Sequence, residues 1–330
     1  MAQSLFFPGR VHVMNLAEQI EICCLMEATA RKPGNVHPAA SFTDLSYDDF
    51  VRAAAATAEP LAEASRVGVG RAVFNAIEAT RRETGTNVNL GIVLLIAPLA
   101  AVPAGLSLRE GIRKVLIGTT IEDAEHVYAA IRLAQPGGLG EVPLQDVADR
   151  PTFTLRDTML LAAFRDRIAE QYVTDFDFVL NKSLPVFCRV FEHFTEAISK
   201  ATRRDSSADA AMHPWEMAIL NLQLRILAAD LDSLIVRKCG LEIATEVQQR
   251  AKRSRKSGPP DSTSASDALQ DFDLWLRADG HRRNPGTTAD LIAATLFAAV
   301  RDGLIEPPSR DDILRHAARI RQTPAGRNPS

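Results

Sequence analysis

Apolar residues recur at spacings of three and four along most of the chain, which is the period of an α-helix with one buried face. Few segments show the apolar–polar alternation of a half-buried strand. We therefore expect an all-α protein with no sheet of consequence. The predicted helices cover residues 15–30, 46–65, 67–82, 87–97, 107–117, 120–134, 154–172, 174–200, 212–237, 240–253, 266–279, 288–303 and 309–321.

Helix starts are marked by capping boxes, in which Ser, Thr or Asn is followed three residues later by an acid. The predicted pairs are Asn15 with Glu18, Ser46 with Asp49, Ser107 with Glu110, Thr120 with Asp123, Thr154 with Asp157, and Thr287 with Asp290. Loops are predicted at Gln135-Pro136-Gly137-Gly138, at 203–209 and, as a mobile loop, at 254–266. We expect a single helical bundle domain over residues 1–330 whose tail frays after about residue 322.

The longest uncharged run, Leu90 to Leu106, is broken by Pro98 and Pro103. This favours a buried core helix that ends at Ala97 over a membrane span.

Composition and the absence of common motifs exclude several functional classes. The chain is 46% hydrophobic and 24% charged, as in ordinary soluble proteins, and its net charge of −3 provides no basic field for nucleic acid. Its four cysteines form no CxxC pair, and no signal peptide is evident, so we expect a reduced, cytoplasmic protein. The absence of a P-loop, GxGxxG, GxSxG or paired zinc motif argues against a routine kinase, Rossmann dehydrogenase, serine hydrolase or zinc enzyme.

Two short polar turns near opposite ends of the chain are the strongest candidates for chemistry. The first follows Glu27 and contains Lys32 and Asn35, and the second runs from Asn284 through Gly286 and Thr287. Each combines a proline that fixes φ with a glycine and with side chains able to hold phosphate or metal. They suggest one anionic-ligand site built from both ends of the chain. The structural alternatives are a helix stop at the first turn and an acid at Asp290 that only caps a helix.

Two further segments fit the same site. Asn87 and Asn89 open an apolar helix whose first amides can face an anion, although simple capping is the alternative. A helix is predicted to carry Asp230, Asp232 and Ser233 with Arg237 and Lys238 among apolar residues. Charges in such a place need a partner or a metal, so either an Asp–Arg pair or an Mg²⁺ site is expected.

A weaker group lies on one predicted helix and is interpreted as surface decoration. It consists of Arg165, Asp166, Gln171 and Tyr172.

These segments, in this order on a helical background, resemble the triphosphoribosyl-dephospho-CoA synthase family over most of the chain. The resemblance is carried by Lys32-Pro33-Gly34, by Asn87 with Gly91, by Asp232 with Arg237 and Gly240, and by Asn284-Pro285-Gly286 with Ala289-Asp290-Leu291. It implies an all-α fold and a transfer in which the 2′-hydroxyl of 3′-dephospho-CoA attacks C1′ of the ATP ribose and adenine leaves. The product is the precursor of the prosthetic group of citrate lyase and malonate decarboxylase.

The resemblance also implies roles for particular residues. Departure of a nitrogen base builds positive charge on the ribose, which a carboxylate, Glu27 or Asp232, would stabilise or use to accept a proton. Mg²⁺ is expected with the triphosphate of ATP, with Asp230 and Asp232 as ligands. The expected phosphate or substrate contacts are Lys32, Asn35, Asn87, Asn89, Arg237, Lys238, Asn284, Gly286 and Thr287.

One departure leaves the acceptor open. The central family motif reads Val-Asn-Thr-His-Lys-Gly, whereas this chain places Asn89 at the His and Leu90 at the Lys. The alternatives are a related ATP-dependent transferase that serves a one-carbon-carrier cofactor of the methanopterin or methanofuran type, and a nucleotide-binding accessory protein without catalysis. We expect small nucleotide partners, no nucleic acid and no membrane, and the sequence leaves a homodimer open.

Overall fold

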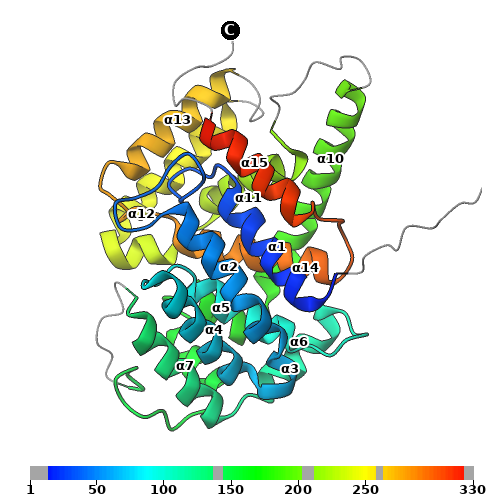
Figure 1. Cartoon of the computed structure of the whole chain (residues 1–330). Coiled ribbons are helices and arrows are strands. Elements are labelled where there is room, and N and C mark those ends of the chain that lie inside the picture. Colours follow the sequence, from blue (N-terminus) through cyan, green and yellow to red (C-terminus); the bar gives the residue numbers. More distant parts are fainter. Residues whose placement is uncertain (1–13, 137–143, 203–211, 258–262, 323–330) are drawn as a thin grey trace, which may run out of the picture.

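The computed structural model describes residues 14–136, 144–202, 212–257 and 263–322, and this part of the chain is helical without a strand (Figure 1). The all-α prediction is confirmed. The helices are α1 (Leu16–Thr29), α2 (Tyr47–Ala62), α3 (Ala64–Val67), α4 (Val69–Thr84), α5 (Leu90–Ala100), α6 (Leu108–Ile117), α7 (Ile121–Ala134), α8 (Leu155–Ala162), α9 (Arg167–Val173), the π-helical turn η1 (Phe178–Ser183), α10 (Leu184–Thr202), α11 (Pro214–Ala229), α12 (Ser233–Lys256), α13 (Thr263–Arg277), α14 (Gly286–Arg301) and α15 (Arg310–Gln322).

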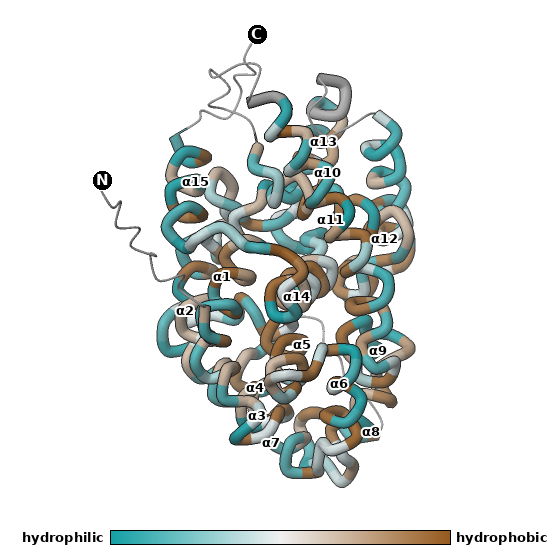
Figure 2. The backbone as a smooth tube through the Cα atoms, turned by 90° about the vertical axis from the view of Figure 1, so that its right-hand side faces the viewer, coloured by the Kyte–Doolittle hydropathy of each residue, from teal (hydrophilic) through white to brown (hydrophobic). Residues whose placement is uncertain are grey.

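Helix α14 forms the centre of the bundle because it is apolar on nearly all sides. A helix of this kind must be covered all round, and α1, α5, α10 and α11 pack against it. Figure 2 shows α14 and α5 as mainly hydrophobic segments in the middle of the molecule. On one side of this centre α2, α4 and α7 pack in sequence, and on the other α10 to α13 do so (Figure 1).

The capping boxes locate most helix starts correctly. Both reciprocal hydrogen bonds are present at Asn15, Ser46, Ser107 and Thr120, and Thr154 caps α8. The predicted box of Thr287 with Asp290 is wrong. Helix α14 begins earlier, at Gly286, and no side chain from its own first turn caps it.

Two long predicted helices are divided by aspartates that cap a later helix. The predicted helix 154–172 breaks after Ala162, because Asp166 accepts hydrogen bonds from the first amides of α9. The predicted helix 212–237 ends at Ala229, because Asp232 caps α12 in the same way. The prediction that Asp230 and Asp232 lie within one helix is therefore wrong, because Asp230 ends α11 and Asp232 begins α12.

Other boundaries also move. Helix α12 continues through the predicted break at Gly240 with a kink, where φ is 85°. It extends to Lys256, and α13 starts at Thr263, so the loop predicted at 254–266 is shorter, with 258–262 outside the described residues. The predicted loop at 203–209, Gly137-Gly138 and the tail after Gln322 also lie outside them.

Helix α5 continues past Pro98 to Ala100 instead of ending at Ala97. Pro98 has no N–H for the carbonyl of Leu94, one turn earlier. The buried hydroxyl of Tyr172 donates to that oxygen at 2.6 Å, so the interpretation of Tyr172 as surface decoration is wrong. None of the described helices, α5 included, combines the length and the apolarity needed to cross a membrane.

This replacement of a helix hydrogen bond by a tyrosine is testable with a double-mutant cycle. Tyr172→Phe leaves the buried Leu94 carbonyl unpaired and should lower the free energy of unfolding by about 1–3 kcal/mol. In a Pro98→Ala background the new N–H can reach the same carbonyl, so Tyr172→Phe should cost clearly less there. Denaturant unfolding of the four proteins measures both values, and an equal cost in the two backgrounds would contradict this explanation.

Candidate active site

A cavity of about 840 Å³ opens where the starts of α5, α9, α12 and α14 converge. Nine of the twelve predicted site residues line it: Glu27, Asn35, Asn87, Asn89, Arg237, Lys238, Asn284, Gly286 and Thr287. Lys32, Asp230 and Asp232 do not.

The two polar turns meet at this cavity, as the sequence suggested. Asn35 Nδ2 donates to Asn284 Oδ1 at 2.6 Å across 249 residues of sequence. Gly34 has a φ of 76° and lies so close to Pro285 that an added Cβ would approach the proline ring to 2.9 Å. Buried Gln223 donates to Asn35 Oδ1 at 2.9 Å and fixes the orientation of that amide.

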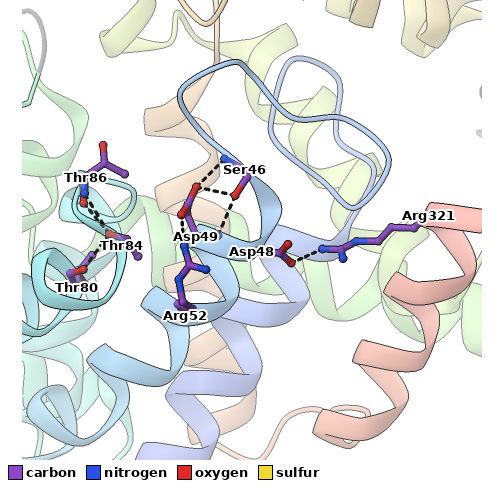
Figure 3. Close-up of polar contacts among 8 residues, drawn as sticks. All are labelled: Ser46, Asp48, Asp49, Arg52, Thr80, Thr84, Thr86 and Arg321. Carbon is purple, nitrogen blue, oxygen red and sulfur yellow. Dashed lines mark hydrogen bonds and ion pairs between the residues drawn. The ribbon is translucent and has the colours of Figure 1, made fainter.

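Three smaller sets of polar contacts fix the backbone near the cavity (Figure 3). Ser46 and Asp49 cap α2, while Asp48 pairs with Arg321 of α15. At the end of α4 the Thr84 hydroxyl bonds to Thr80 O and to the backbone of Thr86, which itself lines the cavity. The chain thus enters the Asn87–Asn89 segment from a fixed turn.

Glu27 lies on the cavity wall, and Lys32 is its counter-ion. Lys32 is fully buried behind the wall, and its Nζ lies 2.9 Å from Glu27 Oε1. The same ammonium donates to the backbone carbonyls of Glu27 and Ala30, so its donors are used within the protein. Lys32 was predicted to contact phosphate, but in this geometry it neutralises Glu27.

Asp232 joins α12 to α14 and does not face the cavity. Its Oδ1 accepts from the amides of Leu234 and Ile235, and its Oδ2 accepts from the amide and hydroxyl of Thr288, all within 3.1 Å. These four donors fill the acceptor sites of a carboxylate. Burial raises the pKa of Asp232, and the same donors oppose that rise. Its predicted roles, as a carboxylate that stabilises ribose charge or accepts a proton and as a metal ligand, do not fit this arrangement.

Asp230, the other predicted metal ligand, is half exposed and pairs with Arg167 at 2.8 Å. The described residues contain no group of three or more His, Cys, Asp or Glu side chains that could hold a metal ion. Asp230 and Asp232 pair with different protein groups in this structure, which gives no support to the predicted Asp230–Asp232 metal pair.

Arg237 and Lys238 both line the cavity, but they differ in availability. Arg237 pairs with Asp166, the cap of α9, which makes Asp166 part of the site instead of surface decoration. Desolvation lowers the pKa of Lys238. Lys238 is the better placed of the two to meet a substrate anion, because no carboxylate within 4 Å pairs with it among the described residues.

Asp290 is the site residue that the sequence analysis missed. It lies on the cavity wall, and among the described residues it has no hydrogen-bond or ion-pair partner. Desolvation, followed by the charges of Glu27, Asp232 and Asp166, raises its pKa well above the ordinary range. Gly91 makes room for it, because an added Cβ there would lie only 2.0 Å from Asp290 Oδ2.

The start of α5 adds donors and one unpaired acceptor. Asn87 Oδ1 accepts from the amide of Leu90, whereas the buried Asn89 Oδ1 has no partner. The next two residues of the first helical turn, Gly91 and Ile92, line the cavity, and their amides have no partner inside the helix. Across the cavity Gly286 and Thr287 open α14, and the Thr287 hydroxyl bonds to Ser233 at 3.1 Å.

Comparison with known proteins agrees with this architecture. A family model described as ATP:dephospho-CoA triphosphoribosyl transferase (CitG) matches residues 13–307. Among solved structures, a protein from Archaeoglobus fulgidus provisionally named a triphosphoribosyl-dephospho-CoA synthase superposes with a TM-score of 0.54. It is 23% identical, and the match covers 77% of this chain and 99% of that one, which shows a shared fold. No curated protein matches the chain.

The structural role of Asp232 can be separated from a metal-binding role. Asp232→Asn places an amide N–H₂ among hydrogen-bond donors and should lower the free energy of unfolding by about 1–3 kcal/mol. Asp230→Asn, in a half-exposed ion pair, should cost at most about 1 kcal/mol. Chemical denaturation measures both. Similar small stability changes, with parallel loss of Mg²⁺ affinity, would instead support a metal pair.

Proposed function

The chain belongs to the ATP:dephospho-CoA triphosphoribosyl transferase family, and we propose that the polar end of its cavity is where this transfer takes place, with Asp290 as the proton acceptor. The protein is thus a transferase that moves the triphosphoribosyl group of ATP to dephospho-CoA. The comparisons favour neither a one-carbon-carrier acceptor nor an accessory protein without catalysis.

The reaction requires a group that accepts a proton at the attacking hydroxyl. The 2′-hydroxyl oxygen of dephospho-CoA forms a bond to C1′ of the ATP ribose, the C1′–N9 bond breaks, and adenine leaves with that electron pair. A carboxylate is an effective base for this step only if its affinity for protons is raised toward the working pH. Asp290 supports this role because it is unpaired, borders the cavity and has a raised pKa. This is the observation that carries the proposal.

The second carboxylate, Glu27, suits a different part of the reaction. As the bond to adenine lengthens, positive charge develops on the ribose ring, and a nearby anion stabilises it. The ion pair with Lys32 keeps Glu27 in a fixed position on the wall. The two acids therefore differ in environment, one paired with a cation and one unpaired, which is how enzymes assign different roles to two carboxylates.

The triphosphate of ATP needs cations and N–H donors. Lys238, the amides of Gly91 and Ile92 on α5, and the amide of Thr287 on α14 are the candidates among the residues that line the cavity. Mg²⁺ fits the same region, because it is commonly held by one or two carboxylates together with substrate phosphates, and Glu27 and the unpaired Asn89 Oδ1 offer oxygen donors. The ion would neutralise phosphate charge during binding.

The reaction itself gives a direct test. The purified protein, incubated with ATP, Mg²⁺ and dephospho-CoA, should release adenine in step with consumption of dephospho-CoA, as followed by liquid chromatography and mass spectrometry. Omitting the acceptor provides the control and should abolish adenine release. Intact ATP and dephospho-CoA after prolonged incubation would contradict the assignment.

Asp290 should reduce stability while it supports activity. An unfolded aspartate titrates near pH 4, and the raised folded-state pKa means that the folded protein holds this proton to higher pH. Stability is therefore lost as pH rises above about 4, until the folded-state pKa is passed. Asp290→Asn removes that loss, so its melting temperature should exceed that of the wild type by a margin that grows from pH 4 toward neutrality.

The same variant should lower kcat by about 10²–10⁴-fold, because it cannot accept the hydroxyl proton. Asp271→Asn, an exposed aspartate of α13, is the matched control and should change neither quantity. Full activity in Asp290→Asn, or a melting difference that does not vary with pH, would remove Asp290 from the proposed role.

A further inference from the structure

The cavity has a second, apolar half that the proposed chemistry does not use. Its walls come from α7, α8 and the segment before α8, and they include Val127, Ile131, Leu144, Val147, Met159 and Leu161. The charged groups discussed above come from other elements, namely the end of α1 and the starts of α9, α12 and α14. One cavity therefore offers two chemically different regions.

Three uncharged polar residues that border the apolar half are already engaged with the protein. Tyr128 Oη donates to Gln145 O at 2.7 Å, and Gln145 Nε2 donates to Thr152 Oγ1 at 2.9 Å. Thr158 Oγ1 donates to Leu155 O at 2.8 Å. This region thus has little to offer to a purine, whose ring nitrogens need hydrogen-bond partners and, in the leaving group, a proton.

The rim of this half is also apolar. Phe164 is 86% exposed, Leu144 55% and Leu161 37%, and all three border the cavity. Large apolar side chains gathered at the mouth of a pocket mark a surface that a ligand covers. The occupant they suit is long, mainly aliphatic and able to extend toward solvent.

We infer that the apolar half binds the pantetheine arm of dephospho-CoA, and this inference rests on the proposed function. The acceptor consists of an adenosine, which carries the attacking hydroxyl, joined through a pyrophosphate to an arm of methylenes, a gem-dimethyl group, a hydroxyl, two amides and a terminal thiol. With the ribose at the carboxylates of Glu27 and Asp290, the arm is the part of either substrate that matches aliphatic walls. ATP has no comparable group, so these walls select the acceptor and not the donor.

Two adjacent leucines of α8 provide a matched test. Leu161 borders the cavity, whereas Leu160 is 55% exposed and does not border it. Leu161→Asp should raise KM for dephospho-CoA about tenfold or more, the effect of losing one leucine contact that the bound arm would cover, with kcat and KM for ATP near wild-type values. Leu160→Asp introduces the same charge into the same helix and should change none of these quantities.

A probe that lacks the nucleoside makes the result independent of turnover. By calorimetry, 4′-phosphopantetheine should bind the wild type and Leu160→Asp, and bind Leu161→Asp about tenfold or more weakly. In the transfer assay it should compete with dephospho-CoA and not with ATP. Competition with ATP, equal effects of the two leucine variants, or no binding of the probe would overturn the inference while leaving adenine release, and hence the proposed function, intact.

Discussion

The hydrogen bond between Asn35 and Asn284 is the contact on which the site depends, because it joins two turns from opposite ends of the chain. It holds the end of α1, which carries Glu27, against the start of α14, which carries Asp290. Gln223 leaves Asn35 only one orientation, and Asp232 fixes the second turn from behind through Thr288. Buried amide and carboxylate networks of this kind are costly if one member is missing, so they specify one arrangement of the helices.

The sequence predicted the fold well where the deciding interactions are local. Helical periodicity and reciprocal capping boxes such as Ser46 with Asp49 depend on residues three or four apart, and they were confirmed. The prediction failed where a polar residue is used across the structure. Asp166 and Asp232 each cap a new helix within a segment that was predicted to be one continuous helix. The Tyr172 hydroxyl bonds to the Leu94 carbonyl that Pro98 leaves unpaired in α5, and only the packed structure shows this contact.

The same distinction between local and long-range interactions explains which parts of the site could be predicted from the sequence. The meeting of the two turns was predicted from their composition, since proline, glycine and asparagine in both indicate rigid polar corners. The role of Lys32 could not be predicted, because burial decides whether an ammonium faces a ligand or a carboxylate. Asp290 was missed because its spacing from Thr287 imitates a capping box. The informative signal was Pro285 followed by Gly286, which favours an earlier helix start and leaves Asp290 beyond the cap.

The substitution at position 90, where the family motif has lysine and this chain has leucine, changes the balance of charge in the cavity. Glu27 and Asp166 each have a protein cation, Lys32 and Arg237, whereas Asp290 has none among the described residues. The family resemblance implies a lysine at position 90, and leucine there removes one positive charge from the wall. An unpaired carboxylate in a desolvated cavity is expensive unless it keeps a proton or meets a cation. The raised pKa of Asp290 is the first of these two outcomes, and a cation that accompanies ATP would shift Asp290 toward the ionised form that accepts the hydroxyl proton.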